Sequence, residues 1–205
     1  MTRRIVLASA SPRRRELLAA LVSEFEVEPA EIPEELTGDA IDCARQLAYA
    51  KAEAVARHHP AAVVIGCDTV VFRGLKLYGQ PATIPEAIAM LHELRGRAHQ
   101  VVTAVTLIGP EGTAIDHEVS TVLMANLPDE ILEAYAASGR TLDKAGGYAI
   151  QHEDVQPVER LEGCYCAVMG LPLWTLHRLL ELFGCAPKRP DESHARCAAC
   201  PARPH

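Results

Sequence analysis

The feature that most constrains the fold is the apolar, β-branched run at residues 63–71, which contains one carboxylate, Asp68. Such a run is typical of a strand in the middle of a sheet, covered on both faces. A carboxylate is costly to bury there without partners, whereas near the end of a central strand it commonly faces a cleft. We therefore predict that Asp68 is a functional residue. The alternative is a buried aspartate satisfied by backbone amides or by Thr69.

Strand and helix patterns alternate in the first part of the chain, and hairpin patterns follow. Residues 5–8 are typical of a short buried strand, and residues 40–58 have apolar side chains at helical spacing. Residues 101–108 and 118–123 flank a glycine-rich turn, which predicts a hairpin. Residues 164–169 are predicted to form a further strand. This order favours a mixed α/β sheet with flanking helices over a purely doubly wound sheet.

Composition excludes several function classes. The 205 residues carry a net charge of −7, which disfavours non-specific nucleic-acid binding. No stretch approaches the ~20 apolar residues of a membrane span. The apolar segment before Ser9 is too short for a signal peptide, so we expect a cytoplasmic location. The seven cysteines are then expected to be reduced thiols.

Residues 187–205 are rich in proline, alanine and charge, and we predict a flexible tail that follows a domain at residues 1–186. This tail contains Cys197 and Cys200 in a Cys-x-x-Cys pair, with His194 and His205 nearby. Such a group can hold zinc, but no second pair lies at a standard spacing. A loose tail with free thiols is the interpretation that we favour.

A candidate phosphate site lies at residues 9–15. Ser11 is placed as an N-cap, and Pro12 follows at the first helical position. A helix N-terminus and the hydroxyls of Ser9 and Ser11 suit an anion. The successive arginines oppose the helix dipole, and an anionic ligand would remove that conflict. The alternative is a capped surface helix with solvated arginines.

Three other segments carry candidate groups. Glu34 lies in an acidic loop from which a carboxylate could join Asp68 around a divalent cation. Lys51 lies on the predicted helix 40–58 among small apolar residues, where it either reaches a phosphate or extends to solvent. Residues 143–151 contain paired glycines that allow backbone to approach a ligand, and Gln151 offers both a donor and an acceptor. The alternatives are a solvated loop and a plain turn.

In chain order, these segments resemble the Maf family of nucleoside triphosphate pyrophosphatases. The matching motifs are ASASPRR at 8–14, Glu34, LAYAKA at 47–52, GCDTVV at 66–71, GRAHQVVT at 96–103, DKAGGYAIQ at 143–151 and GLPL at 170–173. Each motif alone is weak, but the ordered set is specific. The resemblance implies an elongated mixed sheet with flanking helices and a central cleft, similar to inosine triphosphate pyrophosphatases, and a homodimer.

The resemblance also implies hydrolysis between the α- and β-phosphates with a divalent metal ion, Mg²⁺ or Mn²⁺. It assigns Asp68 as general base or metal ligand and Glu34 as a second metal ligand. The residues that it assigns to substrate binding are Ser9, Ser11, Arg13, Arg14, Lys51, Thr69, Lys144 and Gln151. Three of these, Arg13, Thr69 and Gln151, match the subgroup that acts on dTTP and UTP. Normal and modified pyrimidine nucleotides are both compatible with this match.

One position departs from the family pattern. Gln80 stands where the family usually has a lysine before Pro81. Because glutamine cannot neutralise phosphate charge, either activity is lower or another cation, Lys76 or Arg73, compensates. The departure keeps open a second function class, a nucleotide-binding regulator with weak or no catalysis.

Overall fold

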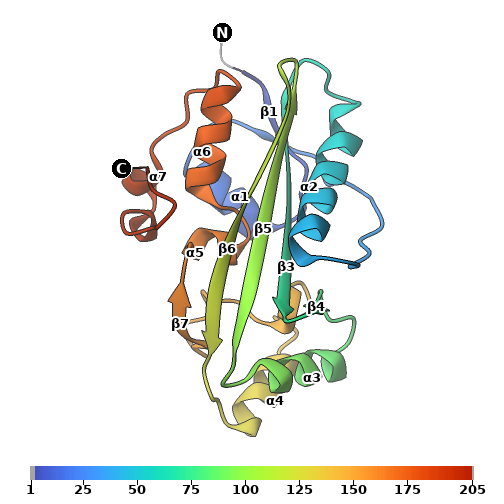
Figure 1. The fold of residues 1–205 in the computed structure, drawn as a ribbon, viewed down its shortest axis with the longest axis vertical. Helices are drawn as coiled ribbons and strands as arrows, with labels where there is room; N and C mark the ends of the chain where they lie inside the picture. The colour runs from blue at the N-terminus through green and yellow to red at the C-terminus, as the bar shows by residue number, and fades with distance from the viewer. Residues whose placement is uncertain (1–2, 205) are drawn as a thin grey trace.

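A mixed sheet runs the length of an elongated molecule (Figure 1). The computed structural model describes residues 3–204. Its strands are β1 (Ile5–Leu7), β2 (Glu26–Val27), β3 (Val63–Arg73), β4 (Lys76–Tyr78), β5 (Ala98–Gly109), β6 (Gly112–Met124) and β7 (Val158–Glu162). They pair in the order β2-β1-β3-β5-β6-β7, with β4 also on β3. The pairs around β1 are parallel and the others antiparallel, which confirms the predicted mixed sheet.

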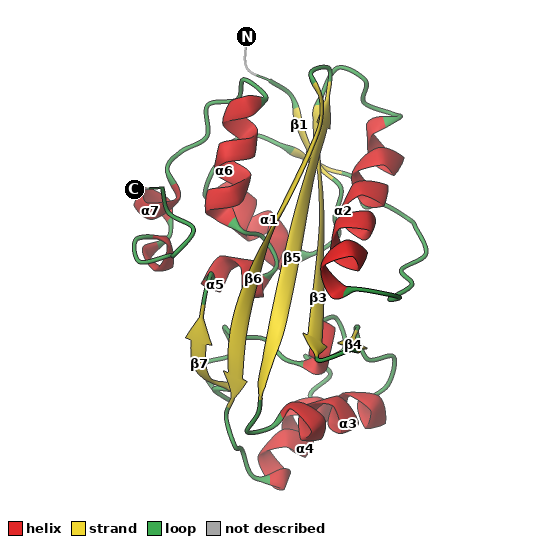
Figure 2. Cartoon of the chain, viewed as in Figure 1, coloured by secondary structure: helices red, strands yellow, loops and turns green. Residues whose placement is uncertain are grey.

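Helices cover both faces of this sheet (Figure 2). They are α1 (Pro12–Ala19), α2 (Ala40–Ala56), α3 (Ile84–Leu94), α4 (Asp129–Ala137), α5 (Tyr165–Met169), α6 (Leu173–Leu182) and α7 (Pro190–Ser193), with 3-10 turns η1 (Ala145–Gly147) and η2 (Ala195–Cys197). Leu7 lies in the core cluster with α1 and α6, whereas its neighbour Val6 lies in the cluster with α2. Because successive strand residues point to opposite faces, α2 covers one face and α1 and α6 the other. Among residues 3–204, no helix combines the length and apolar character needed to cross a membrane.

The sheet has a break along one edge of β3. Along β3, the pairing with β1 stops at Ile65, opposite Leu7, and the pairing with β4 starts at Val71, opposite Tyr78. On the opposite edge β5 pairs with β3 without interruption. Residues 66–70 therefore have no strand neighbour on the broken edge in the described chain. Of the side chains in this stretch, those of Asp68 and Thr69 line a cavity, whereas Cys67 and Val70 are fully buried.

The segment at residues 164–169 is a helix, α5, and not the predicted strand. Cys164 is its N-cap, and the Cys164 thiol accepts a hydrogen bond from the Ala167 backbone N–H. Gly170 ends the helix in a left-handed conformation, with φ of 119°. The periodicity of a short apolar run does not distinguish a buried strand from a buried helix. Here the residues that cap both ends of the segment favour the helix.

The described part of the tail folds onto the protein, which differs from the flexible tail that the sequence predicts at residues 187–205. Cys197 and Cys200 are buried in the cluster with α6, and the Trp174 indole N–H donates to the Cys197 carbonyl at 2.9 Å. The prediction was based on the proline, alanine and charge content of the segment. It did not consider that cysteine behaves as a small apolar residue that is often buried. His205, named as a zinc candidate, lies outside the described residues.

Gly66 brings α2 close to β3. A Cβ atom at Gly66 would lie 2.2 Å from the Ala48 carbonyl oxygen and 2.6 Å from the Ala52 nitrogen, both backbone atoms of α2. We predict that Gly66→Ala lowers the free energy of unfolding by about 3 kcal/mol, because backbone cannot move aside as a side chain does. Urea denaturation measures this loss. Gly74→Ala is the control: it has open space but a φ of +61°, and it should cost about 1 kcal/mol. Equal losses would contradict the steric explanation.

Candidate active site

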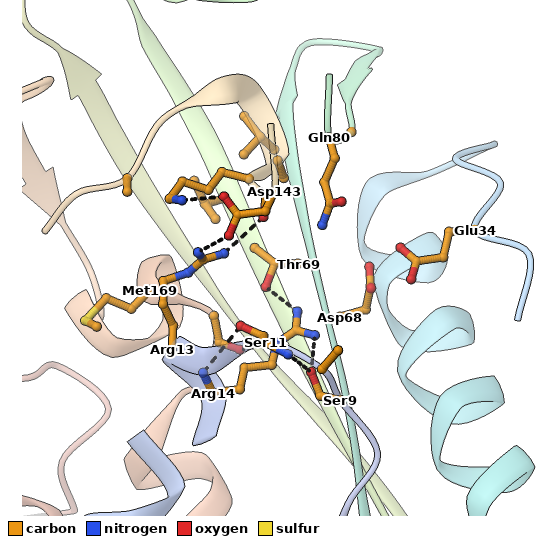
Figure 3. A pocket seen from close by; sticks show the side chains of 18 of the residues that line it. Ser9, Ser11, Arg13, Arg14, Glu34, Asp68, Thr69, Gln80, Asp143 and Met169 are labelled. Atoms are coloured by element: carbon orange, nitrogen blue, oxygen red, sulfur yellow. Dashed lines mark hydrogen bonds and ion pairs between the residues drawn. The ribbon is translucent and has the colours of Figure 1, made fainter. Parts of the chain in front are cut away.

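A cavity of 890 Å³ opens at the break in the sheet. All of the side chains that the sequence predicts for the site line this cavity: Ser9, Ser11, Arg13, Arg14, Glu34, Lys51, Asp68, Thr69, Lys144 and Gln151. They come from the β1–α1 connection, the acidic loop, α2, β3 and the loop around η1. Figure 3 shows several of them pointing toward one another across the cavity. The predicted central cleft is therefore present, and the tertiary structure gathers residues far apart in the chain.

A buried lysine joins the two predicted acidic residues. The Lys51 ammonium lies 2.6 Å from an Asp68 carboxylate oxygen and 2.7 Å from a Glu34 carboxylate oxygen. Lys51 and Asp68 are 6% and 4% exposed, so Lys51 does not extend to solvent as a surface lysine would. The close approach of α2 at Gly66 places Lys51 over this part of β3.

Burial controls the protonation of Asp68. It raises the pKa of this carboxyl above its ordinary value, while the charges of Lys51 and Arg14 oppose the shift. A raised pKa is typical of a carboxylate that accepts a proton during a reaction. Burial likewise raises the pKa of the neighbouring Cys67 to about 11, so its thiol stays protonated and does not serve as a nucleophile at neutral pH.

The Arg14 side chain forms hydrogen bonds to residues from three different segments that line the cavity. Its guanidinium donates to the Ser9 hydroxyl at 3.3 Å, to the Thr69 hydroxyl at 3.2 Å and to the Gly170 carbonyl at 3.0 Å. Thr69 and Asp68 are adjacent on β3 and point to opposite faces, so the cavity wraps around the open edge of the strand. Ser11 caps α1 and accepts weakly from the Arg14 backbone N–H at 3.5 Å.

Arg13 and Lys144 share one carboxylate. Asp143 accepts from the Arg13 guanidinium at 2.9 Å and from the Lys144 ammonium at 2.5 Å (Figure 3). Burial alone would raise the pKa of Asp143, but hydrogen bonds from Lys144 and Arg13 bring it below its ordinary value. Burial lowers the pKa of Lys144, although Asp143 opposes that shift. The Asp143 carboxylate therefore holds two cationic side chains, Arg13 and Lys144, at the cavity wall.

Two acidic residues that line the cavity, Asp143 and Glu86, were not predicted as site residues from the sequence. Asp143 is within the motif at 143–151 but received no role there. Glu86 lies in the first turn of α3, where its backbone N–H donates to the hydroxyl of the N-cap Thr83 and its carboxylate accepts from the Ala82 backbone N–H at 2.9 Å. The Thr-x-x-Glu spacing of Thr83 and Glu86 was the signal that could have placed Glu86 at a helix start.

Gln80 lines the cavity, but the two cations suggested as its replacement do not. The Lys76 ammonium pairs with Glu93 at 2.6 Å on the exposed surface. Arg73 is exposed and is not among the cavity-lining residues. The structure therefore contradicts compensation by Lys76 or Arg73 in this conformation.

The donor set fits a hard divalent cation. Carboxylate oxygens of Glu34 and Asp68 converge from two elements on one point, which the Lys51 ammonium occupies. Mg²⁺ typically takes one or two carboxylates together with substrate phosphates. A cation can be held between Glu34 and Asp68 if Lys51 turns toward a phosphate.

A family comparison agrees with the motifs in this cavity. Residues 4–183 match the model of the family described as Maf-like protein. The chain belongs to the Maf-like family. The matched range covers β1 through α6 and all of the predicted site residues.

Relatives of this Maf-like chain carry a consistent name. A Thermomicrobium roseum protein named dTTP/UTP pyrophosphatase is 48% identical over 206 residues, covering 98% of this chain and 94% of that protein. An Aquifex aeolicus protein with the same name is 42% identical over 179 residues, covering 87% and 94%. Among solved structures, the Staphylococcus aureus Ham1 protein matches with a TM-score of 0.45 and 19% identity, over 60% of this chain and 73% of that one.

Proposed function

We propose that this Maf-like chain hydrolyses nucleoside triphosphates to the monophosphate and pyrophosphate, with dTTP and UTP or modified pyrimidine nucleotides as substrates. The observation that carries the proposal is the buried Lys51–Asp68 pair at the open edge of β3, facing arginines across one cavity. The relatives named dTTP/UTP pyrophosphatase support it. So do Arg13, Thr69 and Gln151, which line the cavity together.

The charges of the cavity suit a triphosphate at one wall and an attacking water at the other. Arg13, Arg14 and Lys144 supply donors for phosphate oxygens, and charge-assisted hydrogen bonds of this kind are strong and directional. Asp68 accepts a proton from the water that attacks the α-phosphorus. Pyrophosphate then leaves, and the cationic side chains with the α1 N-terminus stabilise its developing charge. Positioning and electrostatics supply most of the acceleration in this chemistry.

A divalent metal ion, Mg²⁺ or Mn²⁺, belongs to the proposal. Glu34 and Asp68 would hold it, because their carboxylate oxygens already converge. The ion would supply charge neutralisation for the phosphates. Lys51 would then exchange its carboxylate partners for a phosphate oxygen. Dialysis against EDTA followed by addition of each metal tests this requirement through pyrophosphate release.

We extend the proposal to a homodimer, which the family resemblance supports, and to a cytoplasmic location. Light scattering coupled to size exclusion measures the mass against the 22.2 kDa of one chain. A mass of one chain at micromolar concentration would contradict the dimer.

A pyrophosphate-release assay over a panel of triphosphates tests the function. We expect turnover of dTTP and UTP, with at least about tenfold lower kcat/KM for ATP and GTP, because Gln151 and its neighbours would select the base through hydrogen bonds. Products are identified by chromatography, since cleavage between the α- and β-phosphates yields a monophosphate. Tight nucleotide binding without pyrophosphate release would overturn the proposal in favour of a regulator.

Restoring a positive charge at position 80 is expected to improve substrate binding. Gln80 lines the cavity and is exposed, so Gln80→Lys should lower KM by about fivefold, equivalent to about 1 kcal/mol, with little change in kcat. Gln46→Lys adds the same charge at a site outside the cavity and should leave KM unchanged. Steady-state kinetics on dTTP measure both. Equal changes in the two variants would assign the effect to net charge.

A further inference from the structure

Outside the cleft, three metal-ligating side chains from separate segments meet at one point. Cys166 lies in α5, Cys197 ends η2, and His194 lies between α7 and η2. Their sulfur and nitrogen atoms all lie within 4.8 Å of one another. Both cysteines are 1% exposed, and His194 is half-buried. Figure 1 shows α7 and the chain end beside α6, on the side where α5 lies.

The spacing of these atoms suits a shared tetrahedral ion. The Cys166 sulfur lies 3.6 Å from the Cys197 sulfur and 3.7 Å from the His194 Nδ1 atom. With zinc bonds of about 2.3 Å to sulfur and about 2.0 Å to nitrogen, tetrahedral geometry places two ligand sulfurs about 3.8 Å apart and sulfur and nitrogen about 3.5 Å apart. A disulfide needs its sulfurs about 2.0 Å apart, well below the separation of Cys166 and Cys197.

A fourth ligand is available in the same cluster. Cys200 stands three residues after Cys197, the Cys-x-x-Cys spacing common in structural zinc sites. Its thiol pairs with Cys164 in the core cluster that also contains Cys166. Cys164 is already engaged as the N-cap of α5, accepting from the Ala167 backbone N–H at 3.4 Å. Because Cys164 caps α5, Cys200 is the thiol that would leave this pair and turn toward the other three ligands.

We propose that Cys166, His194 and Cys197 bind a structural zinc ion, with Cys200 as the fourth ligand. Thiolate and imidazole donors select zinc over Mg²⁺ or Mn²⁺, which prefer oxygen. Four protein ligands leave no open position for a substrate, so the ion has a structural role. The ion would fasten the C-terminal segment to α5.

Helix α5 lies between the proposed zinc ion and the cleft, so the ion does not take part in the reaction. Gly170, which ends α5, accepts the Arg14 hydrogen bond at 3.0 Å, and Met169 lines the cavity. A zinc ion behind α5 would therefore stabilise one cavity wall from outside. The proposal does not depend on the proposed hydrolytic function, and its test uses no activity measurement.

The test is metal analysis of the untagged full-length protein, purified under reducing conditions and dialysed against EDTA. We expect about one zinc ion per chain, and less than about a tenth of that in Cys166→Ser, His194→Ala and Cys197→Ser. Cys185→Ser is the matched control, because Cys185 is half-buried and lies outside the ligand group, and it should retain zinc. Zinc content below about a tenth in the wild type would overturn the proposal.

Cobalt substitution keeps the proposal testable if a variant fails to fold. Wild-type protein refolded with Co²⁺ should show the visible bands of a tetrahedral ion and a near-ultraviolet thiolate-to-cobalt band. Cys200→Ser should weaken the thiolate band by about a third, since one of three sulfurs is lost. An octahedral spectrum would contradict the site, and an unchanged band in Cys200→Ser would remove Cys200 from it. A disulfide between Cys166 and Cys197, found by non-reducing mass spectrometry in protein purified without reductant and left unbroken by added zinc, would also overturn the proposal.

Discussion

Asp68→Asn is expected to lower kcat/KM for dTTP by about 10²- to 10⁴-fold, the range typical of the loss of a general base. The substitution keeps the volume of the side chain and removes its charge and basicity. Asp68 is 4% exposed and contacts Lys51 at 2.6 Å, so water has little access to replace the missing carboxylate. Pyrophosphate release measures the loss. Asp42→Asn, on the exposed face of α2 outside the cavity, should keep the wild-type rate.

The same substitution should not destabilise the fold at neutral pH. Burial raises the pKa of Asp68 in the folded protein, so the folded state favours the protonated form relative to the unfolded chain. Stability from such a group is present at low pH and is lost as the pH rises through the folded pKa. Asp68→Asn removes the cost of burying the ionised carboxylate at pH 7, and Glu34 still pairs with the Lys51 ammonium at 2.7 Å, so the thermal midpoint should change little. A purified Asp68→Asn protein with wild-type rates would falsify the catalytic role, and a large fall in the midpoint would contradict the electrostatic argument.

Wild-type activity should also depend on the ionisation of Asp68, but in the opposite direction. Because Asp68 must be ionised to accept a proton, kcat/KM should decline toward acid with a midpoint above the ordinary aspartate value of 3.8.

Lys51→Met is expected to be the second most damaging change, with a loss of about 3 kcal/mol in the free energy of unfolding at pH 8. The substitution removes the Lys51 ammonium, which contacts both carboxylates. The Asp68 carboxylate is then buried beside Glu34 without a cation between them. The pKa of Asp68 is then expected to rise further, because the attraction of Lys51 is lost. By the same linkage, the deficit should shrink as the pH is lowered and Asp68 is protonated. Urea denaturation from pH 5 to pH 8 measures the trend, and kcat/KM should fall by at least about 100-fold.

Lys76→Met is the matched control for this prediction. Lys76 also pairs with a carboxylate, Glu93, at 2.6 Å, but its side chain is 58% exposed. Exposed pairs contribute only about 0–1 kcal/mol, so this variant should change stability little. A similar loss in both variants, or a deficit in Lys51→Met that does not vary with pH, would contradict the role assigned to burial.

Several elements were predictable because their patterns repeat along the chain. Helix α2 over 40–56 and the β5–β6 hairpin were predicted from helical spacing and from alternation around a turn. The segment at 164–169 was predicted wrongly, because its helix depends on the Cys164 cap and on Gly170 rather than on a repeating pattern. The described part of the tail differs from its prediction because buried cysteines, not overall composition, decide its packing.

Part of the candidate site was likewise predictable from the chemistry of single residues, and part of it depends on tertiary contacts. The residue types at Asp68 and at Ser9–Arg14 already pointed to a buried carboxylate and an anion site, since burial cost and helix termini are local properties. The sequence could not place Lys51 between Glu34 and Asp68, because this depends on how close Gly66 lets α2 approach. Nor could the sequence predict the hydrogen bond between Arg13 and Asp143, which are 130 positions apart in the chain.

The sequence by itself determined the mixed α/β fold class, the family and a set of candidate site residues that all line the cleft, because these follow from motifs, periodicity and residue chemistry. Only the tertiary structure decided which charges pair, where the sheet opens, and that Cys166 meets His194 and Cys197. The physical reason is that pairing depends on distances of a few ångströms between segments far apart in the chain. Those distances are set by how the elements pack, and spacing along the sequence does not record them.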